Sequence, residues 1–229
     1  MDGDGGKAVG QYRSQKSGSK LDVPAVLARL DEHSPDAQRD ALEQIQETLD
    51  DRPERCLPTV PKLRALLEQP DLPFLDRVAY CLAELAVASP TDVAPSTDVI
   101  AAFVADHESH EATPELVRCL AAVATERPAA LSEHVDALAA VLERDEPAAR
   151  ADAAITLARV ADDGESLDLP QERLLAALED DHPRVRANAC AALGHGDVTD
   201  AREPLETLAS DDPESSVRER AKWALERIA

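Results

Sequence analysis

Two histidine–glutamate pairs are the most conspicuous reactive groups in this chain. His107-Glu108 and His110-Glu111 lie within five residues of one another. His and Glu at such spacing can bind a metal ion. However, they stand in a polar stretch just before Thr113, where we expect a solvated acidic loop. The other histidines are scattered and indicate no Ser–His–Asp grouping, and the sequence has no glycine-rich phosphate loop. We therefore predict no catalytic residue, no metal and no cofactor.

The four cysteines do not indicate redox or metal chemistry either. They lie 25, 38 and 71 residues apart, and none forms a C-x-x-C pair. All lie within apolar helical patterns, where a free cysteine behaves as a small hydrophobic residue: Cys56, Cys81, Cys119 and Cys190. Unpaired thiols of this kind fit a reducing cytoplasm.

The charge of the chain excludes two classes of partner. Asp and Glu number 46 against 24 Lys and Arg, a net charge of −22, which opposes binding to nucleic acid and to anionic membranes. No apolar run is long enough to span a membrane.

Only five basic residues are lysine, Asp is abundant and aromatics make up 2%. This composition resembles proteins of salt-loving archaea, in which salt screens the repulsion between carboxylates. An ordinary acidic bacterial protein is the alternative.

Six arginines recur at near-constant intervals, and each follows a proline by three to five residues. The prolines lie 38, 41, 33, 36 and 30 residues apart, and each is expected to open a helix. With the segments aligned on the arginines, the positions three and six residues later are mostly small or apolar, which is the spacing of a helical core. The six are Arg39, Arg77, Arg118, Arg150, Arg186 and Arg218.

A second set of helical patterns separates these segments, so the unit is a helix–turn–helix of about 36 residues. A fixed period in this range is typical of a solenoid. We expect a flexible tail over 1–20 and an all-α solenoid of about six helix pairs over 21–229. The approximate repeats are 21–51, 52–89, 90–127, 128–163, 164–195 and 196–229.

The stretch from Asp180 to Gly194, DDHPRVRANACAALG, resembles the second helix of a HEAT repeat. The variety is the short one also found in phycobilisome bilin lyases. The match is strong over roughly 165–229, fair over 128–161 and weak in the first three repeats. This resemblance implies a right-handed α-α superhelix whose second helices line the concave side. Armadillo and tetratricopeptide arrays are alternatives, although the first usually has a third helix per unit and the second needs aromatic residues that are scarce here.

The resemblance also implies a role for the arginines. In HEAT-like stacks the equivalent arginine ties one repeat to the next through hydrogen bonds to Asp and to loop carbonyls, which suits its planar fork of donors. We prefer this structural role to a row of phosphate- or carboxylate-binding groups. The candidate partners are Asp36, Asp71, Asp145, Asp181 and Asp212.

Some HEAT-like proteins are enzymes. Deoxyhypusine hydroxylase carries His-Glu pairs directly after the repeat arginine, and no repeat here has one. A HEAT-like DNA glycosylase uses a basic concave face with catalytic Asp and Trp, whereas this chain is acidic and has one Trp. A metal-dependent hydroxylase, a bilin-lyase-like enzyme and a regulatory subunit of an enzyme stay as alternatives to a non-catalytic scaffold.

The second helices of repeats two and three are apolar on all sides. Val78 and Cys119 stand one residue after the arginine, and Leu82 and Val123 five residues after it. A helix that is apolar all round needs cover on every side. These four therefore either form an exposed strip that docks a partner, with Tyr80 nearby, or are covered by neighbouring helices.

Trp223, five residues after Arg218, either caps the last repeat or adds a docking contact. We expect a cytoplasmic scaffold or adaptor that binds another protein on its concave face. Pairing of two copies through the same apolar strip stays open.

Overall fold

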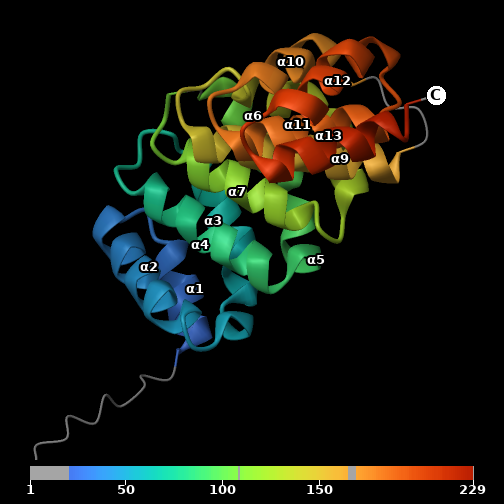
Figure 1. Cartoon of the computed structure of the whole chain (residues 1–229). Coiled ribbons are helices and arrows are strands. Elements are labelled where there is room, and N and C mark those ends of the chain that lie inside the picture. The colour runs from blue at the N-terminus through green and yellow to red at the C-terminus, as the bar shows by residue number, and fades with distance from the viewer. Residues whose placement is uncertain (1–20, 108, 165–168, 229) are drawn as a thin grey trace, which may run out of the picture.

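The computed structural model describes residues 21–107, 109–164 and 169–228, and over these ranges the chain is helical with no strand (Figure 1). The segment 1–20, which we expected to be a tail, lies outside the described residues. The predicted all-α solenoid of about six helix pairs is confirmed. The pairs stack in chain order from one end of an elongated body to the other (Figure 1).

Each pair consists of a first helix and a longer second helix that packs on the next pair. The first helices are α1 (Val23–Leu30), α3 (Val60–Leu66), α6 (Thr97–Asp106), α8 (Val135–Val141), α10 (Gln171–Ala176) and α12 (Arg202–Asp211). The second helices are α2 (Pro35–Leu49), α4 (Leu75–Ala88), α7 (Thr113–Val123), α9 (Pro147–Asp163), α11 (Pro183–His195) and α13 (Ser215–Leu225).

Short segments lead into or extend several of the first helices. They are α5 (Pro90–Val93) and the 3-10 turns η1 (Pro53–Arg55), η2 (Leu57–Thr59), η3 (Ala94–Ser96), η4 (Pro128–His134), η5 (Ala177–Glu179) and η6 (Thr199–Ala201).

The recurring prolines begin the second helices or stand just before them. Pro35, Pro147 and Pro183 occupy the first helical position, where a missing N–H removes no intrahelical bond. The hydroxyl of Ser34 accepts from the Ala37 N–H at 3.5 Å and caps α2. Pro73 and Pro213 instead lie two residues before α4 and α13, and end the preceding turn.

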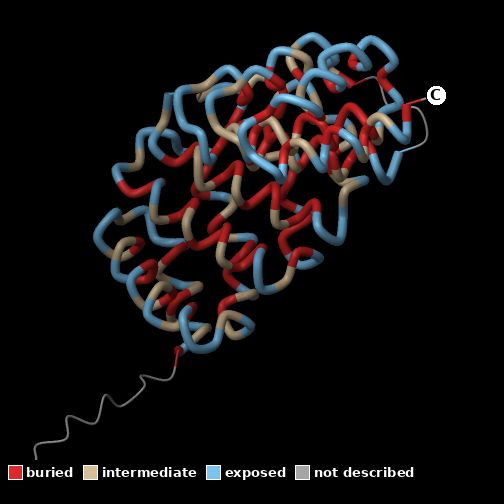
Figure 2. Tube along the Cα trace, viewed as in Figure 1, coloured by how far each residue is buried: buried red, intermediate tan, exposed pale blue. Residues whose placement is uncertain are grey.

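The core runs along the second helices. Helix α4 packs on α7, α7 on α9, α9 on α11 and α11 on α13. The buried stretches in Figure 2 follow this row through the middle of the body. Helices α11 and α13 approach closely at Gly194, because a Cβ atom at that position would lie 2.8 Å from the Cα of Ala224. Among the described residues, no helix is long and apolar enough to cross a bilayer.

Candidate interaction surface and arginine ladder

In repeats four and five the recurring arginine binds the following repeat. The Nε and Nη2 atoms of Arg150 donate to the two carboxylate oxygens of Asp180 at 2.6 and 3.0 Å. Its Nη1 donates to the carbonyls of Arg144 and Asp145 at 2.7 and 2.9 Å. One guanidinium thus binds the turn of its own repeat and a carboxylate of the next, which is the bidentate geometry that Arg favours.

Arg186 repeats this arrangement one unit later. It donates to both carboxylate oxygens of Asp212 at 2.7 and 3.0 Å, and to the carbonyls of Asp180 and Asp181 at 2.7 and 3.2 Å. Arg218, in the last pair, donates to the carbonyls of Asp212 and Pro213 at 2.6 and 3.0 Å. We call these three arginines with Asp180 and Asp212 the arginine ladder.

The carboxylate side chains of the ladder are at most 10% exposed and are ionised. Only 2% of the Asp212 side chain and 11% of the Arg186 side chain are exposed. The hydrogen bond from Arg186 lowers the pKa of Asp212 and outweighs the opposing effect of burial. Burial raises the pKa of Asp180, but hydrogen bonds from Arg150 and from the His182 N–H bring it below its ordinary value. The same bonds raise the pKa of both arginines.

In repeats one to three the equivalent arginines bind their own or the preceding repeat. Arg77 donates to the side-chain oxygen of Gln46 at 3.0 and 2.6 Å. Arg118 lies 2.9 Å from Glu84 of the preceding repeat and 2.6 Å from Glu115 on its own helix. Arg39 pairs with Asp36 at 2.9 Å. The ion pairs of Arg39 and Arg118 are more exposed than those of the ladder.

The expected aspartate partners divide into three groups. Asp36 and Asp212 contribute carboxylates, while Asp145 and Asp181 contribute main-chain carbonyls. Asp71 takes no part in the described arginine contacts. Sequence reasoning missed Asp180. The signal that could have revealed it is its place six residues before Arg186, which matches the place of Asp212 before Arg218.

The prediction of an exposed apolar strip in repeats two and three is wrong. Val78, Leu82, Cys119 and Val123 are all 0% exposed. The Sγ atom of Cys119 lies 3.5 Å from the Leu82 carbonyl, inside the contact between α4 and α7, and burial raises the pKa of this thiol to about 12. The neighbouring helices therefore cover the strip, which also removes it as a surface for pairing two copies.

The arginine marks different faces of the helix in the two halves, which explains the error. On α4 the partly exposed side chains are Arg77, Tyr80 and Glu84, at offsets of zero, three and seven from the arginine. On α9 they include Asp152 and Ile155, at offsets of two and five. A shift of two residues turns a helix by about 200°. The offsets that are partly exposed on α9 therefore do not predict the exposed face of α4.

An open groove of about 400 Å³ crosses the second helices α4, α7, α9 and α11. Val87, Ile155 and the methyl groups of nearby alanines form its apolar part. Val87 is 61% exposed and is the one exposed large hydrophobic side chain among the described residues. The polar part is made by Arg118, Asp152, Arg159, Arg184 and Asn188.

The arginines of the groove outnumber its carboxylates. The Nη1 atom of Arg159 donates to the Ala121 carbonyl at 2.7 Å, which holds the guanidinium between two repeats. Burial lowers its pKa. Burial also raises the pKa of Asp152, and nearby arginines, Arg184 first, only partly offset this effect. Arg184 lies 4.0 Å from Asp152 and is 68% exposed.

Trp223 lies half-buried on α13, at the end of the stack. Arg227 stands 4.0 Å and Arg220 5.1 Å from its ring centroid, and the His195 ring contacts it edge-on at 4.7 Å. Burial lowers the pKa of His195, although Asp162, 2.8 Å away, opposes this shift. Trp223 thus packs on the end of α11 in the preceding repeat and stays partly exposed.

The histidines before α7 stabilise a loop. His107 stacks on Phe103 with ring centroids 4.3 Å apart, and Nδ1 of His110 accepts from the Ala112 N–H at 3.0 Å. Glu108 lies outside the described residues. Among residues 21–107, 109–164 and 169–228, no group of three or more His, Cys, Asp or Glu side chains is arranged to hold a metal ion.

Known proteins share the architecture of this chain. Residues 171–229 match the sequence model of HEAT repeats. A crystal structure titled as an engineered protein is 23% identical, with a TM-score of 0.75, and the alignment covers 91% of this chain and 97% of that one. A designed armadillo repeat protein is 19% identical, with a TM-score of 0.72, covering 90% and 99%. These similarities show a helical-repeat solenoid. No curated protein matches the sequence.

Proposed function

We propose that this helical-repeat protein is a non-catalytic scaffold that binds another protein along the groove of its second helices. One observation carries the proposal. A single open groove takes side chains from four consecutive repeats, and the one exposed large hydrophobic residue in the described chain, Val87, lies at its edge. A surface assembled from successive repeats suits an extended partner.

Binding in the groove combines apolar and polar contacts. Val87 and Ile155 offer aliphatic surface on α4 and α9, while arginines of three helices offer donors between them. Stacked helices hold the positions of these side chains at fixed separations. Binding therefore costs little conformational entropy of the scaffold. The second helices contact one another in a row and the first helices form the other layer, where Ala105 on α6 offers an exposed control position.

The test compares the proteins that the immobilised wild type retains from a native cell extract with those that two variants retain. In Val87→Asp/Ile155→Asp, two charges enter the groove, and we expect the bound protein to be lost. In Ala105→Asp, one charge enters an exposed position of α6, and we expect capture to persist. Circular dichroism checks that helix content is unchanged, and mass spectrometry identifies what is retained.

Three results would contradict the proposal. Retention of the same partner by the groove variant would place the binding surface elsewhere. Failure of the wild type to retain any protein would argue against a scaffold. Stoichiometric iron in the purified protein would favour the alternative of a metal-dependent hydroxylase.

We further propose that the protein works in a reducing, salt-rich cytoplasm. Its four cysteines are free and buried, and burial raises the pKa of Cys81 and Cys190 to about 12, so these thiols stay protonated. The carboxylates outnumber the basic groups and repel one another at low ionic strength, and salt screens this repulsion. The midpoint of thermal unfolding should therefore rise as KCl increases from about 0.1 to about 3 M, where the Debye length shrinks severalfold. A constant or falling midpoint would contradict this setting.

A further inference from the structure

The groove has the opposite charge balance to the rest of the molecule. In the whole chain, acidic residues outnumber Lys and Arg by 46 to 24. In the groove, three arginines stand against one aspartate: Arg118, Arg159 and Arg184 against Asp152. Two carboxylates beside it, Glu84 and Glu115, are engaged by Arg118. The positive charge of Arg159 and Arg184 is thus opposed mainly by Asp152.

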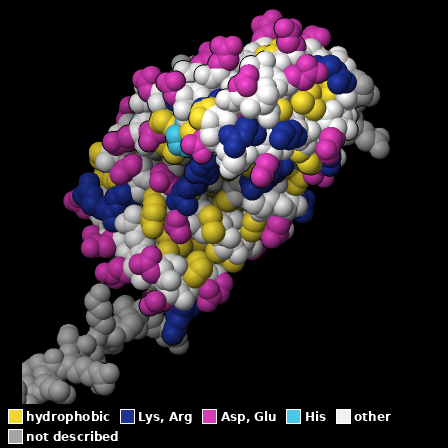
Figure 3. Space-filling view, in the orientation of Figure 1, with side chains coloured by type: hydrophobic (Ala, Val, Ile, Leu, Met, Phe, Trp, Pro, Cys, Tyr) yellow, Lys and Arg dark blue, Asp and Glu magenta, His cyan; other side chains and the backbone are white. Residues whose placement is uncertain are grey.

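Two further arginines, Arg220 and Arg227, lie along the same face at the end of the stack. Arg220, Trp223 and Arg227 stand two, five and nine residues after the arginine of α13, and Asp152, Ile155 and Arg159 hold the same offsets on α9. Contacts from Asp162 to His195 and from His195 to Trp223 join α9, α11 and α13 across this face. Figure 3 shows Lys and Arg side chains gathered over the middle of the visible face, while Asp and Glu predominate around its rim.

Two of these arginines are well placed to receive an anion. Arg184 is 68% exposed, and its described ion pair, with Asp152, is long at 4.0 Å. Arg220 is exposed, and its described contact is with the ring of Trp223. Stacking on an aromatic ring leaves the N–H edge of a guanidinium available to donate. A carboxylate in this position would gain charge-assisted hydrogen bonds.

We propose that the groove and its extension over α13 bind an acidic segment of the partner protein. Its carboxylates pair with Arg184 and Arg220, and an aliphatic side chain packs on Val87 and Ile155. The surface outside the groove repels such a segment, so the charge distribution selects the binding site as well as the partner. The inference rests on the proposed scaffold function and specifies the chemistry of its partner.

A protein segment fits this surface better than a nucleic acid. The basic face is bordered by the acidic majority of the chain, and the long phosphate backbone of a nucleic acid would extend into it. The apolar contribution of Val87 and Ile155 matches an aliphatic side chain and has no counterpart on a phosphodiester backbone.

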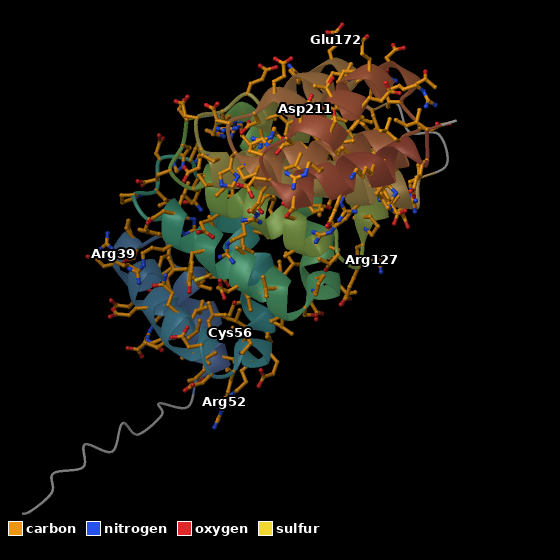
Figure 4. All side chains as sticks on the ribbon, viewed as in Figure 1. Arg39, Arg52, Cys56, Arg127, Glu172 and Asp211 are labelled. Carbon is orange, nitrogen blue, oxygen red and sulfur yellow. The ribbon has the colours of Figure 1, made fainter. Side chains whose placement is uncertain are left out.

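The test uses the full chain against a phage-displayed library of random 12-residue peptides. Enriched peptides are synthesised, labelled and titrated by fluorescence anisotropy, together with a single-stranded oligothymidine of matched charge. Arg184→Glu/Arg220→Glu reverses two charges in the proposed site. Arg52→Glu/Arg173→Glu makes the same change in net charge away from it, with Arg52 at the far N-terminal end of the body (Figure 4).

We expect enriched peptides to carry an excess of Asp and Glu together with an aliphatic residue. The site variant should weaken their binding about tenfold or more, and the control variant less than about twofold. Binding should also weaken as salt rises.

The other outcomes separate the two proposals. Neutral or basic peptides whose binding is lost in Val87→Asp/Ile155→Asp would overturn this inference and leave the scaffold function standing. Acidic peptides that bind the site variant as well as the wild type would overturn the assignment of the site. Tighter binding of the oligothymidine than of any peptide would overturn the choice of a protein segment. A library with no enriched peptide would count against both proposals.

Discussion

The two halves of the solenoid use the same recurring arginine in different ways. In the C-terminal half, Arg150 and Arg186 reach forward to aspartates of the next repeat whose side chains are at most 10% exposed. In the N-terminal half, Arg77 and Arg118 lie on the partly exposed face and reach back to Gln46 and Glu84. A repeated residue therefore marks a repeated unit without marking a repeated contact.

The direction in which each arginine reaches depends on the residue that stands six positions before the recurring arginine of the next repeat. Asp180 and Asp212 stand there in repeats five and six, whereas repeats three and four have Ala112 and Arg144. Arg118 has no carboxylate at that place ahead of it and binds the preceding repeat. Asp71 also occupies the position, yet Arg39 pairs with Asp36 in its own first turn. An aspartate at that spacing is thus insufficient by itself.

The largest effect should follow from removing a ladder carboxylate. Asp212→Ala leaves the guanidinium of Arg186 buried without its carboxylate partner, and breaking a buried pair in this way costs about 3–5 kcal/mol. We expect hydrogen exchange to show loss of protection across α11–α13, with α4 and α7 much less affected, because repeats contact only their neighbours. Equal loss in both halves would mean that the two halves do not differ as described.

The next effect should come from the buried strip of the N-terminal half. Leu82→Ala removes side-chain volume from a site that is 0% exposed, and we expect a loss of about 2–5 kcal/mol. Val87→Ala, on the same helix but 61% exposed, should change stability by less than about 0.5 kcal/mol. Urea unfolding of the two variants measures both. Similar midpoints would show that Leu82 is exposed.

Acid should weaken the C-terminal half before the N-terminal half. The pKa of Asp212 in the folded state lies below its ordinary value of 3.8, so the carboxylate stabilises the fold above that pH. As the pH falls, the carboxyl group of the unfolded chain takes up its proton first. The stabilisation then declines progressively and is fully lost once the folded carboxyl is protonated as well. Protection of α11–α13 from hydrogen exchange should therefore decline below about pH 4.

Asp212→Asn provides the control for the acid experiment, because an amide does not titrate. Its protection of α11–α13 should start lower and depend less on pH than that of the wild type. An unchanged acid response in this variant would assign the effect to other carboxylates.

The smallest effect should come from the exposed counterpart of the ladder. Glu84→Gln removes the charge that faces Arg118, and about a third of each side chain is exposed. Surface pairs of this kind contribute about 0–1 kcal/mol. Thermal unfolding should differ from the wild type by a few degrees at most, and a change as large as that of Asp212→Ala would contradict the distinction between the halves.

Sequence patterns predicted the architecture well, because it depends on local signals. Prolines and helical periodicity at a near-constant interval require a stack of helix pairs, and the structure contains it. The site was predicted less well. Aligning all repeats on the arginine assigned Val78 and Leu82 to the surface, whereas the partly exposed face of α4 carries Arg77, Tyr80 and Glu84. One residue type repeated along the chain does not specify how each helix is rotated.

The sequence by itself determined that this protein is a row of helix pairs, because helix formation and its interruption depend on residues within one or two turns of each other. Only the tertiary structure decided which face of each second helix is covered, which aspartate each arginine binds and where arginines gather in an acidic protein. Those features depend on the rotation of each helix against its neighbours, and that rotation is set by side chains that are 26 or more residues apart in the chain.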